Sequence, residues 1–186
     1  MRILVSGGCK NGKSYYAQRL AKAQQTSSLY YIATMASIDS EDAERIKRHK
    51  QERLGWGFTT IEQPAGIEDI LQKCASDGSF LLDSLTALLA NEMFPPNNSI
   101  NERAADKIME GLSQVLSSTQ NIVVVSDDIF SDAVIYDPFS ESYRRFLADI
   151  DRGVGRICDA VLEISFTNMI VHKGSEAFDA LYKKIR

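Results

Sequence analysis

The chain has few of the residues on which disulfide-rich and zinc-stabilised folds depend. Its 186 residues include three cysteines, four prolines, two histidines and one tryptophan. The cysteines, Cys9, Cys74 and Cys158, lie far apart and form no C-x-x-C pair. The sequence therefore predicts neither a disulfide framework nor a structural zinc site. Such cysteine usage is typical of a reducing compartment, and we expect a cytoplasmic protein.

Long apolar runs and a large net charge are also missing. The apolar stretch from Leu85 to Phe94 is interrupted by Asn91 and Glu92, and it falls far short of the roughly 20 residues that cross a bilayer. The opening MRILVSGG is too short an apolar run for the core of a signal peptide. The net charge of -4 gives no whole-protein attraction to polyanions. We expect no membrane span and no nucleic-acid partner.

What the chain does contain is an alternation of short apolar runs and longer helical patterns. We expect strands at 3–6, 29–33, 57–61, 79–82 and 122–125, and helices at 14–25, 38–53, 67–74, 84–94, 102–118 and 138–160. Residues 161–166 and 169–172 are predicted to pair as an antiparallel hairpin, followed by a short helical extension at 174–186. This alternation predicts an α/β fold with a mostly parallel sheet flanked by helices, in a single domain over residues 1–186.

One motif in this pattern points to nucleotide chemistry. Residues 7–14 match G-x-x-x-x-G-K-[ST] at every fixed position, between an expected strand and an expected helix. In such a loop backbone N–H groups wrap a phosphate, Lys13 reaches the β- and γ-phosphates, and Ser14 ligates Mg²⁺. The alternative is a glycine turn with a surface lysine. The motif predicts a P-loop NTPase of the RecA-like kind. The predicted nucleotide-binding residues of the loop are Gly7, Gly8, Cys9, Lys10, Asn11, Gly12, Lys13 and Ser14.

A carboxylate follows the buried run from Phe80 to Leu82. At the end of a parallel strand, Asp83 resembles a Walker B aspartate, which is held near the metal through water. Aspartate is also a favoured helix N-cap, so Asp83 could instead begin the helix expected at 84–94. The two roles are compatible.

A basic segment carries one of the two histidines. Arg45, His49 and Arg53 are spaced i, i+4, i+8, so they share one face of the expected helix. The flanking arginines disfavour the charged imidazole, and a neutral imidazole is a nucleophile toward phosphorus. From spacing alone, a solvated helix with a surface histidine is the simpler interpretation.

Together these segments resemble the bifunctional adenosylcobinamide kinase / adenosylcobinamide-phosphate guanylyltransferases of cobalamin biosynthesis. The resemblance covers residues 1–172 and is carried by Ile3–Ser14, Tyr31–Thr34, the R-I-x-x-H element ending at His49, and Leu81–Thr86. It implies that ATP or GTP, with Mg²⁺, phosphorylates adenosylcobinamide, and that His49 then carries GMP from GTP to the product. It also implies a homotrimer. The implied catalytic residues are His49 and Lys13, the metal-binding residues Ser14 and Asp83, and further nucleotide-binding residues Thr34, Arg45, Arg53, Glu62 and Asp83.

Two segments depart from the family pattern. After the strand at 122–125 the family has S-N-E-V-G, whereas this chain has Ser126-Asp127-Asp128-Ile129-Phe130. In the late helix, G-x-x-N-Q is replaced by the residues from Arg152 to Arg156. Two alternatives therefore stay open: a P-loop small-molecule kinase that lacks the guanylyltransferase activity, and a non-catalytic GTP-binding module.

Overall fold

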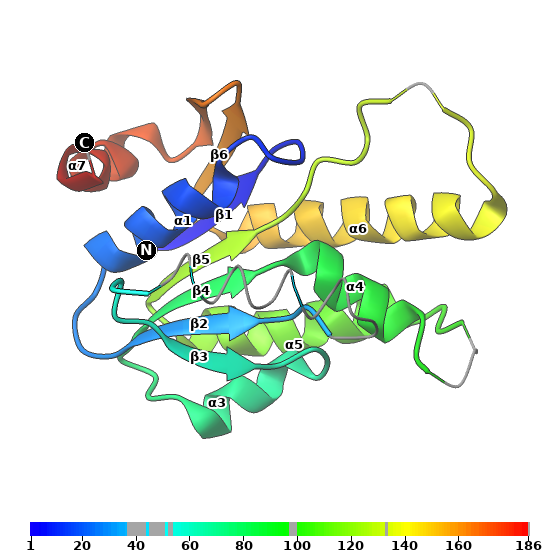
Figure 1. Ribbon diagram of the computed structural model, residues 1–186, viewed down its shortest axis with the longest axis horizontal. Coiled ribbons are helices and arrows are strands. Elements are labelled where there is room, and N and C mark those ends of the chain that lie inside the picture. The colour runs from blue at the N-terminus through cyan, green and yellow to red at the C-terminus, as the bar shows by residue number, and fades with distance from the viewer. Residues whose placement is uncertain (37–43, 45–50, 52–53, 97–99, 133, 186) are drawn as a thin grey trace.

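A seven-stranded sheet forms the centre of the computed structural model, which describes residues 1–36, 44, 51, 54–96, 100–132 and 134–185 (Figure 1). The strand order within this part of the chain is β3-β2-β4-β5-β1-β6-β7. All neighbouring strands are parallel except β6 and β7, which are antiparallel. The strands are β1 (Arg2–Ser6), β2 (Leu29–Ala33), β3 (Thr59–Glu62), β4 (Ser79–Asp83), β5 (Asn121–Val125), β6 (Ala160–Ser165) and β7 (Asn168–Lys173).

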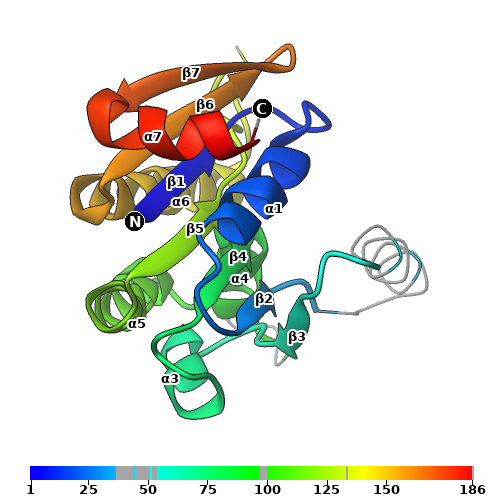
Figure 2. The same ribbon diagram turned by 90° about the vertical axis from the view of Figure 1, so that its left-hand side faces the viewer.

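Helices cover both faces of this sheet (Figure 2). On one face, α1 (Lys13–Ala23) and α7 (Ser175–Ile185) pack with residues such as Ile3 and Val5 of β1. On the other face lie the short 3₁₀ turn η1 (Ile67–Asp69), α3 (Ile70–Lys73), α4 (Leu85–Met93), α5 (Ala104–Ser118) and α6 (Pro138–Ile157). Each face therefore has its own apolar core. The central strands β4, β5 and β1 are buried on both faces, which explains their continuous apolar sequences.

The sequence-based fold is confirmed: the sheet is mostly parallel, flanked by helices, and ends in an antiparallel hairpin. The hairpin turns at Phe166 and Thr167, whose φ angles are 48° and 63°. The third strand begins at Thr59 rather than at Gly57, because Gly57 has φ 84° and cannot continue an extended strand. Likewise, α6 ends at Ile157 rather than at residue 160, because Cys158 turns to an extended conformation that leads into β6.

The basic segment is the main part of the expected fold that this structure does not test. The helix predicted for 38–53 lies outside the described residues except for Glu44 and Gln51, and so do Arg45, His49 and Arg53. Among the described residues, no helix has the length and apolar character needed to cross a membrane.

Candidate functional site

The loop between β1 and α1 has a conformation that depends on its glycines. Gly7 has φ 147°, and a Cβ there would overlap the carbonyl oxygen of Ile164 on β6. Gly12 begins α1 with φ 91°. The Asn11 side chain fastens the loop, since its amide donates to the Ile164 carbonyl and its oxygen accepts from Lys13 N–H at 3.3 Å. The loop is therefore preorganised, with its backbone amides leading into a helix N-terminus that attracts phosphate.

Lys13 is the central charge of this loop. Its side chain is only 6% exposed, and its Nζ donates to the carbonyl oxygen of Gly8 at 2.6 Å. The same Nζ lies 2.8 Å from Oδ1 of Asp127, which comes two residues after β5. Because β5 is the direct neighbour of β1, this ion pair crosses the carboxyl edge of the sheet. A phosphate that approaches Lys13 must therefore compete with Asp127.

This competition gives a first prediction. We expect Asp127→Asn to bind MgATP about three- to tenfold more tightly, because the substitution removes a negative charge from the place where phosphate oxygens must come. Isothermal titration calorimetry measures the effect. Asp149→Asn, which makes the same charge change on the exposed face of α6, is the matched control. Equal or weaker binding by Asp127→Asn would show that Asp127 does not compete with phosphate.

Asp83 lies at the end of β4, beside the start of α1. Its Oδ2 accepts a hydrogen bond from the Tyr31 hydroxyl at 2.7 Å and lies 3.5 Å from the Ser14 Oγ. The alternative role of Asp83 as helix cap is wrong, because Ser84 caps α4 by accepting from Ala87 N–H. A serine hydroxyl next to a carboxylate is a set of oxygen donors that suits Mg²⁺. Among the described residues, no group of three or more His, Cys, Asp or Glu could hold a metal by itself.

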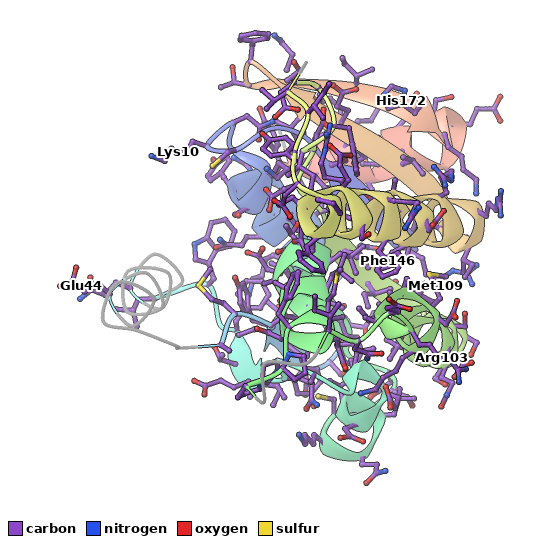
Figure 3. The ribbon with its side chains drawn as sticks, turned by 90° about the vertical axis from the view of Figure 1, so that its right-hand side faces the viewer. Lys10, Glu44, Arg103, Met109, Phe146 and His172 are labelled. Carbon is purple, nitrogen blue, oxygen red and sulfur yellow. The ribbon has the colours of Figure 1, made fainter. Side chains whose placement is uncertain are left out.

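The other predicted site residues lie in different surroundings. Thr34 is fully buried, and its hydroxyl donates to the Ser84 carbonyl at 2.8 Å and accepts from Ser84 N–H at 2.7 Å. It thus joins the ends of β2 and β4. Glu62 ends β3, four strands away from β1, so the fold does not bring it to the phosphate loop. Cys9 and Lys10 are exposed, and Figure 3 shows Lys10 extending outward from the loop.

Asp127, which pairs with Lys13, and Thr86, which contacts Asp127, are not among the predicted site residues. The sequence places Asp127 and Asp128 after the expected strand at 122–125, at the carboxyl edge where function sits in a parallel sheet, but it gives neither a role in the site. Thr86 appears only as part of a resembling segment. The Asp127 N–H donates to Thr86 Oγ1 at 3.1 Å, and the Thr86 carbonyl accepts from the Tyr143 hydroxyl at 2.8 Å. Knowledge of the strand order would have placed both residues in the site, because β5 lies between β4 and β1. The sequence alone does not give that order.

A second carboxylate, that of Asp151 on α6, lies close to Asp127. Burial raises the pKa of Asp151 to about 6. The charges of Asp127 and Asp128 also raise this pKa, whereas the Ser126 side chain lowers it. The native protein therefore holds this proton more tightly than the unfolded chain, in which the pKa is about 4. The free energy of unfolding should fall as the pH rises from about 4 to about 6. Above that range Asp151 is charged in both states, and the free energy of unfolding should stay at its lowered value.

Removal of this charge should stabilise the protein at neutral pH. We expect Asp151→Asn to raise the free energy of unfolding by about 2 kcal/mol at pH 7.5, with a gain that disappears near pH 4. Urea denaturation at both pH values measures it. Asp149→Asn, two residues earlier on the same helix, should change stability by less than about 0.5 kcal/mol at either pH. A gain of the same size at both pH values would contradict the titration of Asp151 as its cause.

Comparisons with known proteins point to one family of enzymes. A family model described as cobinamide kinase / cobinamide phosphate guanyltransferase matches residues 3–166. A bifunctional adenosylcobalamin biosynthesis protein of Pseudomonas aeruginosa is 31% identical over 167 residues, which cover 87% of this chain and 91% of that protein. One from Escherichia coli is 33% identical over 95 residues, which cover 50% of this chain and 51% of that protein.

A solved structure supports the fold. The flagellar accessory protein FlaH from Methanocaldococcus jannaschii is similar with a TM-score of 0.50 and 15% identity, over 92% of this chain and 77% of that one. At this identity the likeness concerns the fold alone. The family match covers most of the chain and contains the phosphate loop, Asp83 and Asp127. The chain therefore belongs to the cobinamide kinase / cobinamide phosphate guanyltransferase family of enzymes.

Proposed function

We propose that this enzyme phosphorylates adenosylcobinamide with a nucleoside triphosphate and then transfers GMP from GTP to the adenosylcobinamide phosphate. The observation that carries the proposal is the buried Lys13 in a preorganised phosphate loop, with Ser14 and Asp83 beside it. Family membership supplies the substrate class, because the family description combines a cobinamide kinase with a cobinamide phosphate guanyltransferase.

In the kinase step the chain mainly positions and neutralises charge. The backbone amides of residues 8–14 hold the phosphates, and the Lys13 ammonium balances the charge that develops on the transferring phosphoryl group. Ser14 and Asp83 would hold Mg²⁺, which when bound draws charge from the β- and γ-phosphate oxygens. The acceptor hydroxyl oxygen bonds to the γ-phosphorus, the bond to the β-phosphate oxygen breaks, and the hydroxyl proton is released.

The guanylyl step is proposed to use His49. Its imidazole nitrogen attacks the α-phosphorus of GTP and pyrophosphate leaves, which forms a guanylyl-histidine. A phosphate oxygen of adenosylcobinamide phosphate then attacks the same phosphorus, which frees the imidazole and yields adenosylcobinamide-GDP. The R-I-x-x-H resemblance supports this role, with Arg45 and Arg53 as phosphate-binding cations. Thr34 and Glu62 remain predicted nucleotide-binding residues.

A two-stage assay tests the proposal. The protein is incubated with Mg²⁺, adenosylcobinamide and ATP labelled at the γ-phosphate, and the corrinoid products are separated before and after GTP is added. We expect labelled adenosylcobinamide phosphate first and adenosylcobinamide-GDP second. Phosphorylation without the second product would favour the kinase-only alternative, and nucleotide binding without either product would favour the non-catalytic module. We also propose a cytoplasmic homotrimer, which sedimentation and fractionation would test.

A further inference from the structure

A large cavity lies outside the phosphate loop, between α4, α6 and the chain that follows β5. Its volume is about 730 Å³, which is within the range of ligand pockets. Each of the three elements contributes side chains to its wall, among them Ala90, Phe94, Ile129, Tyr136, Tyr143 and Arg144. Within the part of the chain that the structure describes, the residues of the proposed nucleotide site do not line this cavity.

The cavity is nevertheless joined to Lys13 by short chains of contacts. Asp127, the partner of Lys13, donates its N–H to Thr86, and Thr86 accepts from the hydroxyl of the cavity residue Tyr143. Asp128, which also lines the cavity, donates its N–H to the carbonyl oxygen of Gly7 at 2.9 Å. The inner wall of the cavity is therefore built against the phosphate loop. A phosphoryl acceptor must present its oxygen at that position.

The lining suits a large amphipathic ligand. Phe94 stacks on Tyr143 with ring centroids 6.3 Å apart, and Ile129 extends this apolar wall. The Arg144 guanidinium lies 5.2 Å from the centre of the Tyr136 ring, and its Nε is buried without a hydrogen-bond partner in the described part of the chain. Exposed apolar side chains lie on the segment between the lining residues Asp132 and Ser140: Val134, Ile135 and Phe139. Contiguous exposed apolar surface often marks a binding site.

The neighbouring cavity is smaller and has more carboxylates. Its volume is about 380 Å³, and its lining includes the carboxylates of Asp128, Asp151 and Glu163 together with Arg152 and His172. The larger cavity includes two carboxylates, those of Asp128 and Asp132, so the smaller one crowds more negative charge into less space and would repel a phosphorylated product more strongly.

We propose that the cavity between α4 and α6 is the acceptor site, and that it takes the hydroxyl-bearing arm of cobinamide with the adjoining edge of its ring. This inference rests on the proposed function. Cobinamide combines a broad ring that carries apolar methyl groups with carboxamide side chains. The apolar wall fits the ring edge, and the Arg144 Nε–H can donate to a carboxamide oxygen. The ring exceeds the cavity, so the remainder would lie against exposed apolar side chains of the segment between Asp132 and Ser140.

The test separates acceptor binding from nucleotide binding. Dicyanocobinamide, whose colour reports its concentration, is equilibrated with the protein by dialysis, and kinase KM values are measured for cobinamide and for ATP. Ala90→Trp fills the cavity and should abolish binding of dicyanocobinamide. Ile129→Ala removes apolar contact and should raise the KM for cobinamide about tenfold, while the KM for ATP is unchanged. Ile170→Ala on β7 is the matched control, since Ile170 is exposed and lies outside the cavity.

The outcomes distinguish the two claims. If the wild-type protein binds and phosphorylates cobinamide and both variants do so equally well, the cavity is not the acceptor site although the function stands. If the wild-type protein neither binds nor phosphorylates cobinamide, the proposed function fails and the inference fails with it. A rise in the KM for ATP equal to that for cobinamide would also overturn the inference, because it would indicate general damage. Thermal unfolding checks that the variants are folded, and Ile129→Ala is the milder change should Ala90→Trp not fold.

Discussion

His49→Ala is expected to abolish covalent labelling of the protein by GTP labelled at the α-phosphate, while phosphorylation of adenosylcobinamide continues. The reason is that the guanylyl-histidine needs an imidazole nitrogen, whereas the kinase step uses Lys13, Ser14 and Asp83. The wild-type label should be lost in acid and kept in base, as a phosphorus–nitrogen bond requires. Adenosylcobinamide-GDP should fall below detection in the variant.

The chain offers a matched control for this experiment, because it has only one other histidine. His172 lies on β7 and is half exposed (Figure 3). Its Nε2 lies 2.8 Å from a carboxylate oxygen of Glu163. His172→Ala should keep the label and both products. If His49→Ala still carried acid-labile label, another residue would be the guanylyl carrier. If the wild-type protein bound GTP and phosphorylated the corrinoid but took no label, the kinase-only alternative would be favoured.

Most of the fold could be predicted because its signals are local. The run Ile122–Val125 is apolar and β-branched over its whole length, and such runs form strands that are buried on both faces. The antiparallel hairpin of β6 and β7 was also predicted from two short apolar runs, although its turn lies one residue earlier than the expected Thr167 and Asn168, and Asn168 already belongs to β7. The errors are at element ends, where a backbone angle decides the boundary, as at Gly57 and Cys158.

The phosphate loop, and Asp83 at the end of its strand, could be predicted because each has a local sequence signal. The loop from Gly7 to Ser14 is a local motif, whereas the ion pair of Lys13 with Asp127 depends on which strand lies next to β1. That neighbour is β5, which is distant in sequence, and no spacing rule encodes it. The same reason explains why the cavity between α4 and α6 was not predicted: its walls come from separate segments that only the folded sheet brings together.

Lys13→Ala is expected to lower the rate of adenosylcobinamide phosphorylation by about 10²- to 10³-fold, the usual effect of removing one preorganised charge from a phosphoryl-transfer site. Lys22→Ala, in the last turn of the same helix, is the matched control and should act like the wild-type protein. A single-turnover assay with ATP labelled at the γ-phosphate measures both variants. A loss of less than about fivefold would indicate that Lys13 does not contact the transferring phosphoryl group.

The ion pair implies that this loss has two parts. Without Lys13, the Asp127 carboxylate stays beside the phosphate loop with no opposite charge at 2.8 Å, so it repels the nucleotide. Lys13→Ala should therefore weaken MgATP binding more than the lost attraction alone. In the double variant Lys13→Ala/Asp127→Asn the repulsion is absent, and MgATP affinity should recover by more than the three- to tenfold gain that Asp127→Asn gives when Lys13 is present, while the phosphorylation rate stays low. If the effects of the two substitutions on MgATP affinity and on phosphorylation rate were simply additive, Asp127 would not be coupled to Lys13. The phosphate would then not displace Asp127 from Lys13.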